Sequence, residues 1–430
     1  MPGKTNATYG DKTNAVQQSV GLFAKSLRRK SLINNMVGKM QNGESSAASQ
    51  IKNESSTHMP ILRVMDLGKQ KGDEVTYNLI QPVNAYPIMG SEYAEGRGTG
   101  MSIVEDRLRV DQARFPIDLG NVMTSIRSPV DFRRIGRPIA QDLMDRYSDG
   151  STLVHLCGAR GFQNSAEWAV PLASHEKFKK IMVNDVKAPT KNRHFIVAGD
   201  AVQPFKVNGG EVDLATTDLF TMDTVDSMRS VMDDMVLPPP CIQVEGDEAA
   251  TDEPLRLWIV SPAQYRWFAK QQGFRTLISN AVARSSNAKN HPLFRGEVGL
   301  WNNFLIRKMS HAIRFNPGDP IRYATSYTSE AEADAIVPAT LGAGYAVDRS
   351  IILGGQALAE AFAAHKGTGV SYFWSEKELD HDDKAELLVG AIRGVKKIRF
   401  NVDVNGDGSE FQYTDHGIVT VDTVVKLQGS

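Results

Sequence analysis

The feature that most constrains the fold is a pair of alternating segments within residues 73–119. In GDEVTYNLIQ, Val75 and Tyr77 fall on one side, and in MSIVEDRLRVDQARFPIDL, Leu108 and Val110 fall on one side. A period of two predicts the two strands of one long hairpin. Their connection, PIMGSEYAEGRGTG, is rich in glycine and charge and poor in large apolar residues. The hairpin therefore cannot build its own core, and it needs a surface to lie on.

An arm of about ten strand residues reaches roughly 30 Å, which is far enough to contact another subunit. We therefore expect that surface to belong to a second copy of the chain. Arg107 and Arg109 alternate with the apolar residues, so their charges face away from the apolar side. The side chains expected at the contact between subunits are Glu92, Tyr93, Glu95, Arg97, Arg107, Arg109 and Arg114.

Residues 1–60 read as an arm, with two short apolar faces at helical spacing followed by a polar linker. The basic triplet Arg28, Arg29 and Lys30 lies between those faces. It fits a solvated helix face, and it also fits a contact with an acidic partner or with DNA. The polar N-terminus lacks the apolar run of a signal peptide.

Composition narrows the class of protein. The formal net charge is −1, so the chain has no overall basic field of the kind that gathers nucleic acid. Cys157 and Cys241 show no metal-ligand spacing, which favours a reducing compartment. The longest nearly apolar stretch is too short to span a bilayer. We expect a soluble protein that is made in a cytoplasm and has no membrane partner.

The clearest helix runs from Ser128 to about Gly158, with Ser128 as the cap and Pro129 at the first helical position. Its expected apolar stripe is Phe132, Ile135, Ile139 and Leu143. Other helices are expected where methionines recur up to Met235, after the cap Ser261, and in IILGGQALAEAFAAHKG. Strands are expected at KNRHFIVAG, LRLWIV and from VKKIRFNV to the C-terminus. This mixture predicts an α+β fold.

A search for chemistry finds no convincing site. No GxGxxG, Walker A or GxSxG pattern is present. His155 and Cys157 are two apart on the expected helix, so buried structural roles are favoured over a catalytic pair. His381, Asp382 and Asp383 resemble a fragment of a metal site but lack further histidines, and we interpret them as a charged helix start. We expect no catalytic residue, no cofactor and no enzyme.

The stretch DVNGDGSE invites a calcium interpretation. Asp403, Asn405 and Asp407 match the first ligands of an EF-hand loop, but its twelfth position is Thr414 instead of glutamate. Asn-Gly and Asp-Gly are also favoured hairpin dipeptides. A plain turn is the preferred interpretation, and a metal ion on Asp403, Asn405 and Asp407 stays open as the weaker one.

Several phrases together carry a family resemblance. They are LFAKSLRRKSLINNMVGK (22–39), STHMPILRVMDLGKQKGDEVTYNL (56–79), PIMGSEYAEGRG (87–98), LVHLCGARG (153–161), NRHFIVAG (192–199), HPLFRGEVGLWNNFLIRK (291–308), ILGGQALAEAF (352–362) and YTDHGIVTVDT (413–423). In order and spacing they resemble major capsid proteins of tailed double-stranded DNA phages, of the N-four-like podovirus kind. None is a chemical motif.

The resemblance implies a Hong Kong 97-type capsid fold with consecutive parts. These parts are an N-terminal arm (1–60), an extended loop (61–120), a peripheral domain with the spine helix (121–254), an axial domain (255–394) and C-terminal strands that return to the peripheral domain (395–430).

The implied function is a structural capsid subunit that self-assembles into hexamers and pentamers of an icosahedral shell. Decoration, portal and scaffold proteins are further implied partners, and packaged DNA lies nearby. Assembly is expected in the cytoplasm of a bacterial host, and the mature location is the virion capsid. The alternatives are a tail-tube or decoration protein, and, far less favoured, a metal-dependent hydrolase at His381.

Overall fold

The structure is a computed structural model of the 430-residue chain. It describes residues 36, 59–64, 74–80, 87–90, 92–97, 103–121, 132–165, 167–242, 255–271, 273, 299–309, 311–363, 365, 371–381, 383–405 and 409–427. The expected helix start at Ser128 and the basic triplet Arg28, Arg29 and Lys30 lie outside these residues.

Helices are fewer than strands in this part of the chain. The helices are α5 (Phe132–Cys157), α6 (Phe178–Met182), α7 (Met222–Asp233) and α9 (Pro262–Lys270), with 3-10 turns η2 (Lys191–Arg193) and η5 (Ala339–Leu341). The strands before α9 are β1 (Ile61–Val64), β2 (Glu74–Ile80), β3 (Ile103–Arg109), β4 (Asp111–Asn121), β5 (His194–Ala198), β6 (Ala201–Pro204), β7 (Val207–Asn208), β8 (Glu211–Val212) and β9 (Arg256–Val260).

The strands after α9 begin with β10 (Gly299–Trp301), β11 (Phe304–Lys308), β12 (Ile313–Phe315), β13 (Pro320–Ala324), β14 (Glu332–Ile336) and β15 (Tyr345–Leu353). They continue with β16 (Leu358–Phe362), β17 (Tyr372–Leu379), β18 (Lys384–Lys397), β19 (Arg399–Asp403), β20 (Phe411–Asp415) and β21 (Ile418–Lys426). Among the described helices, none is both long and apolar enough to cross a membrane.

The largest sheet has the order β10-β11-β9-β15-β21-β5-β6, with β12 also paired to β15. Helices α7 and α9 cover one face, where Met228 and Phe268 pack with Trp258 and Val421. The other face meets the end of α5 through residues such as Leu156. Both faces of β9 are therefore buried, which explains why residues 257–260 are apolar in succession.

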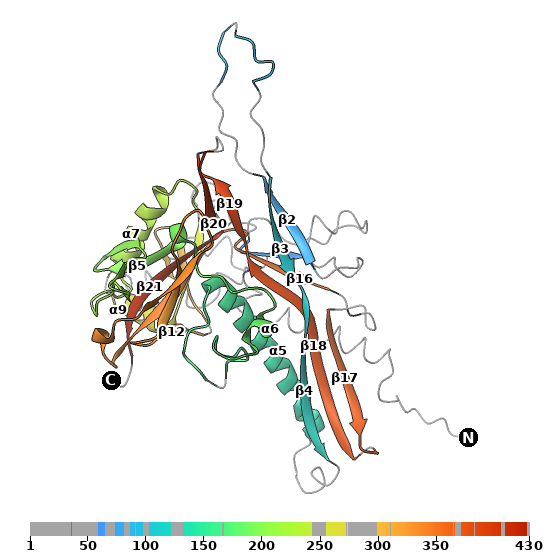
Figure 1. The fold of residues 1–430 in the computed structure, drawn as a ribbon. Coiled ribbons are helices and arrows are strands. Elements are labelled where there is room, and N and C mark those ends of the chain that lie inside the picture. Colours follow the sequence, from blue (N-terminus) through green and yellow to red (C-terminus); the bar gives the residue numbers. More distant parts are fainter. Residues whose placement is uncertain are drawn as a thin grey trace.

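A second sheet forms the platform under α5 (Figure 1). Its long strand β18 pairs with β4 on one edge and with β17 and β16 on the other, and β1 adds to β16. Met144 and Tyr147 of α5 pack on Leu387 and Val389 of β18. Smaller sheets are β13-β14-β8-β7, the hairpin β19–β20 and the hairpin β2–β3.

The expected apolar stripe of α5 was wrong at Ile139, while Leu143 is half-buried and the side chains of Phe132 and Ile135 lie outside the described residues. Ile139 is 50% exposed, whereas Ala140, Met144 and Tyr147 are buried, one position further along the chain. The reason is that the buried face of α5 also carries polar residues. Arg393 of β18 bonds the carbonyl of Ser148 and the hydroxyls of Ser151 and Thr152 there, so apolarity alone misplaces the face.

The expected helix over IILGGQALAEAFAAHKG was also wrong. The first residues of this stretch are the last residues of β15, and a turn follows them. Leu358–Phe362 then form β16, which lies between β1 and β18. Every residue of β16 is buried, and its one charged residue, Glu360, is paired with Arg63 and Arg393. A short continuous apolar run does not by itself distinguish such a strand from a buried helix.

The charged stretch at His381 does not begin a helix. Asp380 and His381 have φ of 57° and 54° in the tight turn that joins β17 to β18. Asp382 lies outside the described residues. The acidic residues suit a solvated turn, where Asp380 accepts a bond from Lys384 at 3.1 Å.

Several local predictions were confirmed. The methionine stripe forms α7, Ser261 caps α9 with a reciprocal bond to Gln264, and KNRHFIVAG contains β5. Asp403 pairs with Phe411 across β19 and β20, so DVNGDGSE lies between two antiparallel strands as the turn interpretation requires. Asp407 lies outside the described residues.

Strand pairing does not follow the five consecutive segments expected from the resemblance. β5, from 121–254, and β21, from 395–430, belong to the same sheet as β9 and β15, from 255–394. Conversely, β16 to β18 pair with β4 under α5. Sheet pairing is non-local, so sequence order alone does not reveal these groupings.

Candidate assembly interface

The hairpin of β2 and β3 is the most prominent projection of the molecule (Figure 1). Seven residue pairs join the strands, from Glu74↔Arg109 to Ile80↔Ile103. Val75 and Tyr77 are half-buried while their neighbours Thr76 and Asn78 are exposed, as the period of two predicted. The described residues of the hairpin therefore have one inward and one outward side.

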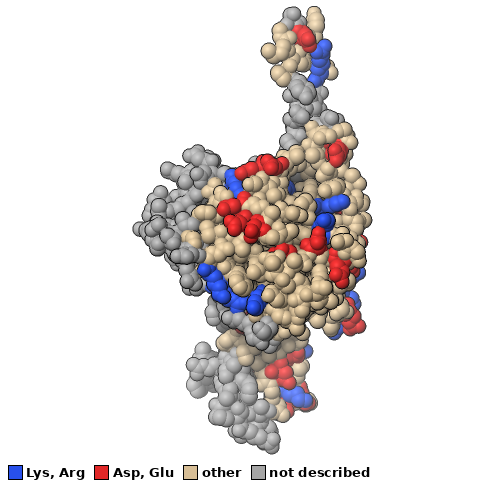
Figure 2. Space-filling view, turned by 90° about the vertical axis from the view of Figure 1, so that its left-hand side faces the viewer, with Lys and Arg blue, Asp and Glu red and all other residues tan. Residues whose placement is uncertain are grey.

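The tip of the hairpin, residues 87–97, stands far from the body, and Figure 2 shows both acidic and basic side chains on it. Arg97 bonds Glu92 at 2.8 Å, and Gly90 and Gly96 adopt positive φ, which gives a compact turn. Met89 and Tyr93 are 72% and 83% exposed. Large apolar side chains this exposed are a common mark of a protein contact.

The root of the hairpin is tied to the body. Leu108 and Val110 are buried with Phe400, and the ring of Tyr77 meets that of Phe400 edge-on at 6.2 Å. The Tyr77 hydroxyl donates to Asp106 at 2.6 Å, and burial followed by the Asp106 charge raises the pKa of this phenol. The root is thus rigidly packed while the tip is not.

The basic residues predicted at the contact are placed on outward sides of this structure. Arg107, Arg109 and Arg114 are all exposed. Arg109 also has a partner in its own hairpin, since its Nε lies 2.6 Å from Glu74. Asp111 and Gln112 are both exposed, which interrupts the alternation of buried and exposed residues at the start of β4. Beyond this interruption, Arg114 lies on the side of β4 that faces away from α5. The structure therefore brings Arg107 and Arg109 together on the hairpin and leaves Arg114 on the platform.

Of the candidate metal residues, Asp403 and Asn405 lie in the described part of the chain, and Asp407 does not. Asp403 is buried, and its Oδ1 accepts from the backbone of Asn405 at 3.2 Å. No group of three or more His, Cys, Asp or Glu residues with metal-binding geometry occurs among the described residues.

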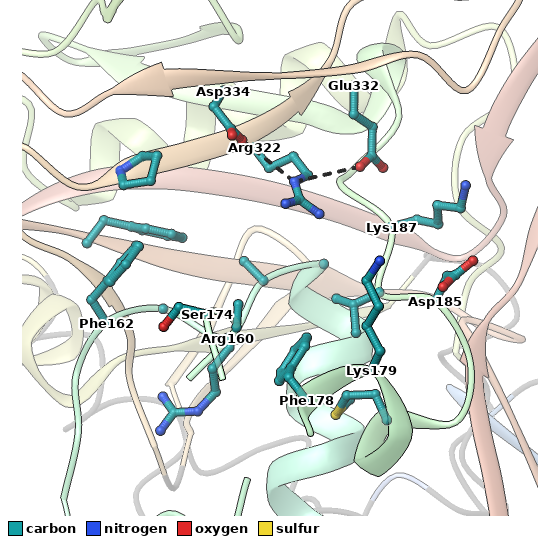
Figure 3. Close-up of a pocket in the computed structure, with 18 of the residues that line it drawn as sticks. Arg160, Phe162, Ser174, Phe178, Lys179, Asp185, Lys187, Arg322, Glu332 and Asp334 are labelled. Carbon is teal, nitrogen blue, oxygen red and sulfur yellow. Dashed lines mark ion pairs between the residues drawn. The ribbon is translucent and has the colours of Figure 1, made fainter. Parts of the chain in front are cut away.

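A cavity of about 560 Å³ opens beside the end of α5 (Figure 3). Phe162 and Phe178 belong to its apolar wall. On the opposite side, the guanidinium of Arg322 lies between Asp334 at 3.6 Å and Glu332 at 3.8 Å. Among its charged side chains, Arg322, Glu332 and Asp334 therefore pair with one another.

The buried ion pairs were missed by the sequence reasoning. Glu360 lies between Arg63 and Arg393, at 2.7 and 2.6 Å, and Asp422 lies between Arg349 and His194, at 2.7 and 2.8 Å. Burial alone would raise the pKa of each carboxyl, but the adjacent arginines lower it. The only sequence signal was charge within apolar strands, as in LAEAF and VTVDT.

Asp415 forms a third cluster of this kind. It contacts Lys397 at 2.9 Å and Arg399 at 2.7 Å, and these cations outweigh its burial and lower its pKa to about 2. The three clusters connect β1, β16 and β18, then β5, β15 and β21, then β18, β19 and β20. They stiffen the body on which the hairpin is mounted.

The arrangement is similar to solved capsid structures. The capsid of Ralstonia phage GP4 matches with a TM-score of 0.65 at 21% identity, covering 87% of this chain and 90% of that chain. The capsid of cyanophage Pam1 matches with a TM-score of 0.56 at 14% identity, covering 86% and 90%. The acid-stable capsid of Helicobacter pylori bacteriophage KHP30 matches with a TM-score of 0.53 at 11% identity, covering 86% and 89%. At these identities the likeness establishes the fold, which is the Hong Kong 97-type capsid fold.

The sequence itself identifies the family. A family model described as "Phage capsid protein" matches residues 6–427. The chain belongs to the phage capsid protein family, and its role is structural, as one of many copies in the capsid of a virion. A search of curated proteins found no match.

Proposed function

We propose that the hairpin clasps a neighbouring copy of the chain in the shell. The observation that carries this proposal is the tip, where Met89 and Tyr93 expose most of their surface at a distance from the body. Glu92, Glu95 and Arg97 surround them and supply polar contacts. Burying such a tip on a neighbour stabilises the assembly without any cost to the fold of the free chain.

Arg107, Arg109 and Arg114 extend the same contact toward the root, facing acidic groups of the neighbour. The segment 1–60 serves as a second clasp, and copies assemble as hexamers and pentamers. We propose that the platform with α5 belongs to the peripheral domain and that the eight-stranded sheet with α7 and α9 belongs to the axial domain. The grouping of strands into these two sheets supports this assignment.

The remaining partners follow from the resemblance. Portal, scaffold and decoration proteins contact the shell, and Arg28, Arg29 and Lys30 face packaged DNA without sequence preference. Assembly takes place in the bacterial cytoplasm, and the role is structural without catalysis. The turn at Asp403, Asn405 and Asp407 is architectural, and any ion there would serve only to stiffen it.

The clasp is tested by deleting residues 86–100. We expect a folded chain with a melting temperature near that of the wild type, because the tip contributes little to the core. We also expect loss of closed shells in negative-stain images. A finer pair of variants is Met89→Ser with Tyr93→Ser, compared with Tyr327→Ser, which alters an exposed aromatic residue of the body. Normal shells from the deletion would refute the clasp.

A further inference from the structure

The hairpin leaves the body at a place where sheet pairing stops. β4 pairs with β18 up to Asp111↔Arg393, while β3 turns away and pairs with β2. At the point of departure the two backbones almost touch, since a Cβ on Gly394 would lie 2.0 Å from the carbonyl oxygen of Arg109. Glycine is required here, and no ladder bond directs β3 beyond this point.

The side chain of Asn184 takes the place of those missing ladder bonds. Its Oδ1 accepts from the backbone N–H of Arg109 at 2.9 Å, and its Nδ2 donates to the Arg109 carbonyl at 2.9 Å. The same Nδ2 donates to the Val395 carbonyl of β18 at 3.1 Å. One buried amide thus joins the root of the hairpin to the platform on both sides of the junction.

The backbone that presents Asn184 is strained. Val183 has φ 64° and ψ −59°, and the N–H of Asn184 bonds the carbonyl of Met182 at 2.7 Å. This is a γ-turn of the rare hand, which is unfavourable for a β-branched residue. Such strain persists where surrounding contacts impose it, and it is concentrated at places where geometry matters to function.

Apart from the apolar contacts of Leu108 and Tyr77 with Phe400, few groups direct the hairpin. Lys396 of β18 pairs with Asp106 and donates to the Arg107 carbonyl at 3.0 Å. Beside these contacts lies a cavity of about 590 Å³, lined by Glu74, Arg109, Asn184 and Lys396 among others. The hairpin therefore has room to swing if the amide contact is lost.

We propose that Asn184 is the positioning residue that sets the direction in which the hairpin leaves the body, with the turn at Val183 aiming its amide. The proposal rests on the clasp function, because direction decides where the tip meets a neighbour. A tip roughly 40 Å from its root moves about 7 Å for a rotation of about 10°, which exceeds what a packed contact tolerates.

The test measures the hairpin in the unassembled full-length chain. Spin labels are placed at Ile103→Cys, at the end of β3 that lies farthest from Arg109, and at Ser230→Cys on α7, both exposed, with Cys241→Ser to remove the half-buried thiol. We expect a single narrow distance distribution for this parent. Asn184→Ala should widen it at least about twofold. The Arg109 amide should also lose about tenfold in hydrogen-exchange protection, as one lost net hydrogen bond predicts.

The matched control is Asn192→Ala, which removes an asparagine that donates to Thr414 at 2.7 Å, away from the junction. It should leave the distribution narrow. Asn184→Asp keeps the accepting oxygen and loses both donated bonds, so its width should be intermediate. Val183→Gly keeps the Asn184 amide and removes the backbone strain of the turn. It replaces Asn184→Ala in this experiment if Asn184→Ala does not fold.

An unchanged distribution in folded Asn184→Ala, or a width matched by Asn192→Ala, would overturn the proposal. Shells formed by each variant are then imaged. Widened distances with misshapen or absent shells support both the positioning role and the clasp. Widened distances with normal shells would retain Asn184 as the residue that positions the hairpin and would instead contradict the clasp.

Discussion

At the scale of residues, buried charge distinguishes this chain from a purely apolar core. Glu360 is held between Arg63 and Arg393, although these arginines are far from it in sequence. Removing one partner from a buried pair leaves an uncompensated charge, so each member depends on the others. Such clusters impose a unique register on the strands that carry them, because a one-residue slip would bury the charges unpaired.

Buried histidines add a dependence on pH. Burial lowers the pKa of His155 to about 3, and burial together with Arg349 lowers that of His194 to about 4. Both rings are neutral in the folded chain, whereas an unfolded histidine titrates near 6.5. Stability is therefore complete above pH 6.5 and falls below it, by about 1.4 kcal/mol per pH unit for each histidine.

Urea unfolding of the unassembled chain at pH 7, 6 and 5 measures this slope. His155→Gln should reduce the dependence of the unfolding free energy on pH by the contribution of one proton, because the residue that binds a proton on unfolding is gone. The exposed His175→Gln serves as the control and should keep the slope of the wild type. Equal slopes for His155→Gln and the wild type would show that His155 is not the group involved.

At the scale of elements, helix caps are the most local determinants of the fold. Ser261 begins α9, where its Oγ accepts from the Gln264 N–H at 3.1 Å and donates to the buried Asp348 at 2.6 Å. Thr221 begins α7 with the same reciprocal box, formed with Thr224. The two caps therefore differ chiefly in the bond to a buried carboxylate.

Ser261→Ala should lower the free energy of unfolding by about 2 kcal/mol, from the lost cap and the lost bond to Asp348. Thr221→Ala should cost about 1 kcal/mol, from the cap alone. Chemical denaturation of the unassembled chain compares the two. A larger loss for Thr221→Ala than for Ser261→Ala would contradict this account of the α9 start.

Caps and alternation were readable from the sequence for a physical reason. They depend on residues within a few positions, as in Ser261 with Gln264 or Val75 with Tyr77. The stretch that became β16 was not readable, because its burial on both faces comes from β1 and β18. The face of α5 was misread for the same kind of reason, since Arg393 supplies polar partners from a distant strand.

At the scale of the whole molecule, the hairpin is a long projection attached to a tightly packed body. Arg107 and Arg114 are exposed on its root and on the platform, while Arg109 is paired with Glu74. Reversal of Arg109 would therefore mix an effect within the chain with one between chains. Arg107 and Arg114 are the cleaner probes of a contact with acidic groups on a neighbour.

Arg107→Glu with Arg114→Glu should reduce the yield of shells at least about tenfold, because like charges across a contact cost on the order of several kcal/mol. The melting temperature of the free chain should stay within a few degrees of the wild type, since both side chains are exposed. Sedimentation velocity measures the fraction of the protein that is assembled into shells. Lys426→Glu, at the exposed end of β21, is the control and should assemble. Full assembly of the double variant would exclude these arginines from the contact.

By itself, the sequence determined the alternating hairpin, the capped helices, the turn between β19 and β20, and membership of a capsid family. These depend on short-range periodicity, capping chemistry and the order of phrases along the chain. Only the tertiary structure decided which strands share a sheet, which face of α5 is buried, and how Asn184 joins the hairpin to β18. Those features depend on groups that meet only after distant segments pack, and no local pattern encodes the partner that a buried group will find.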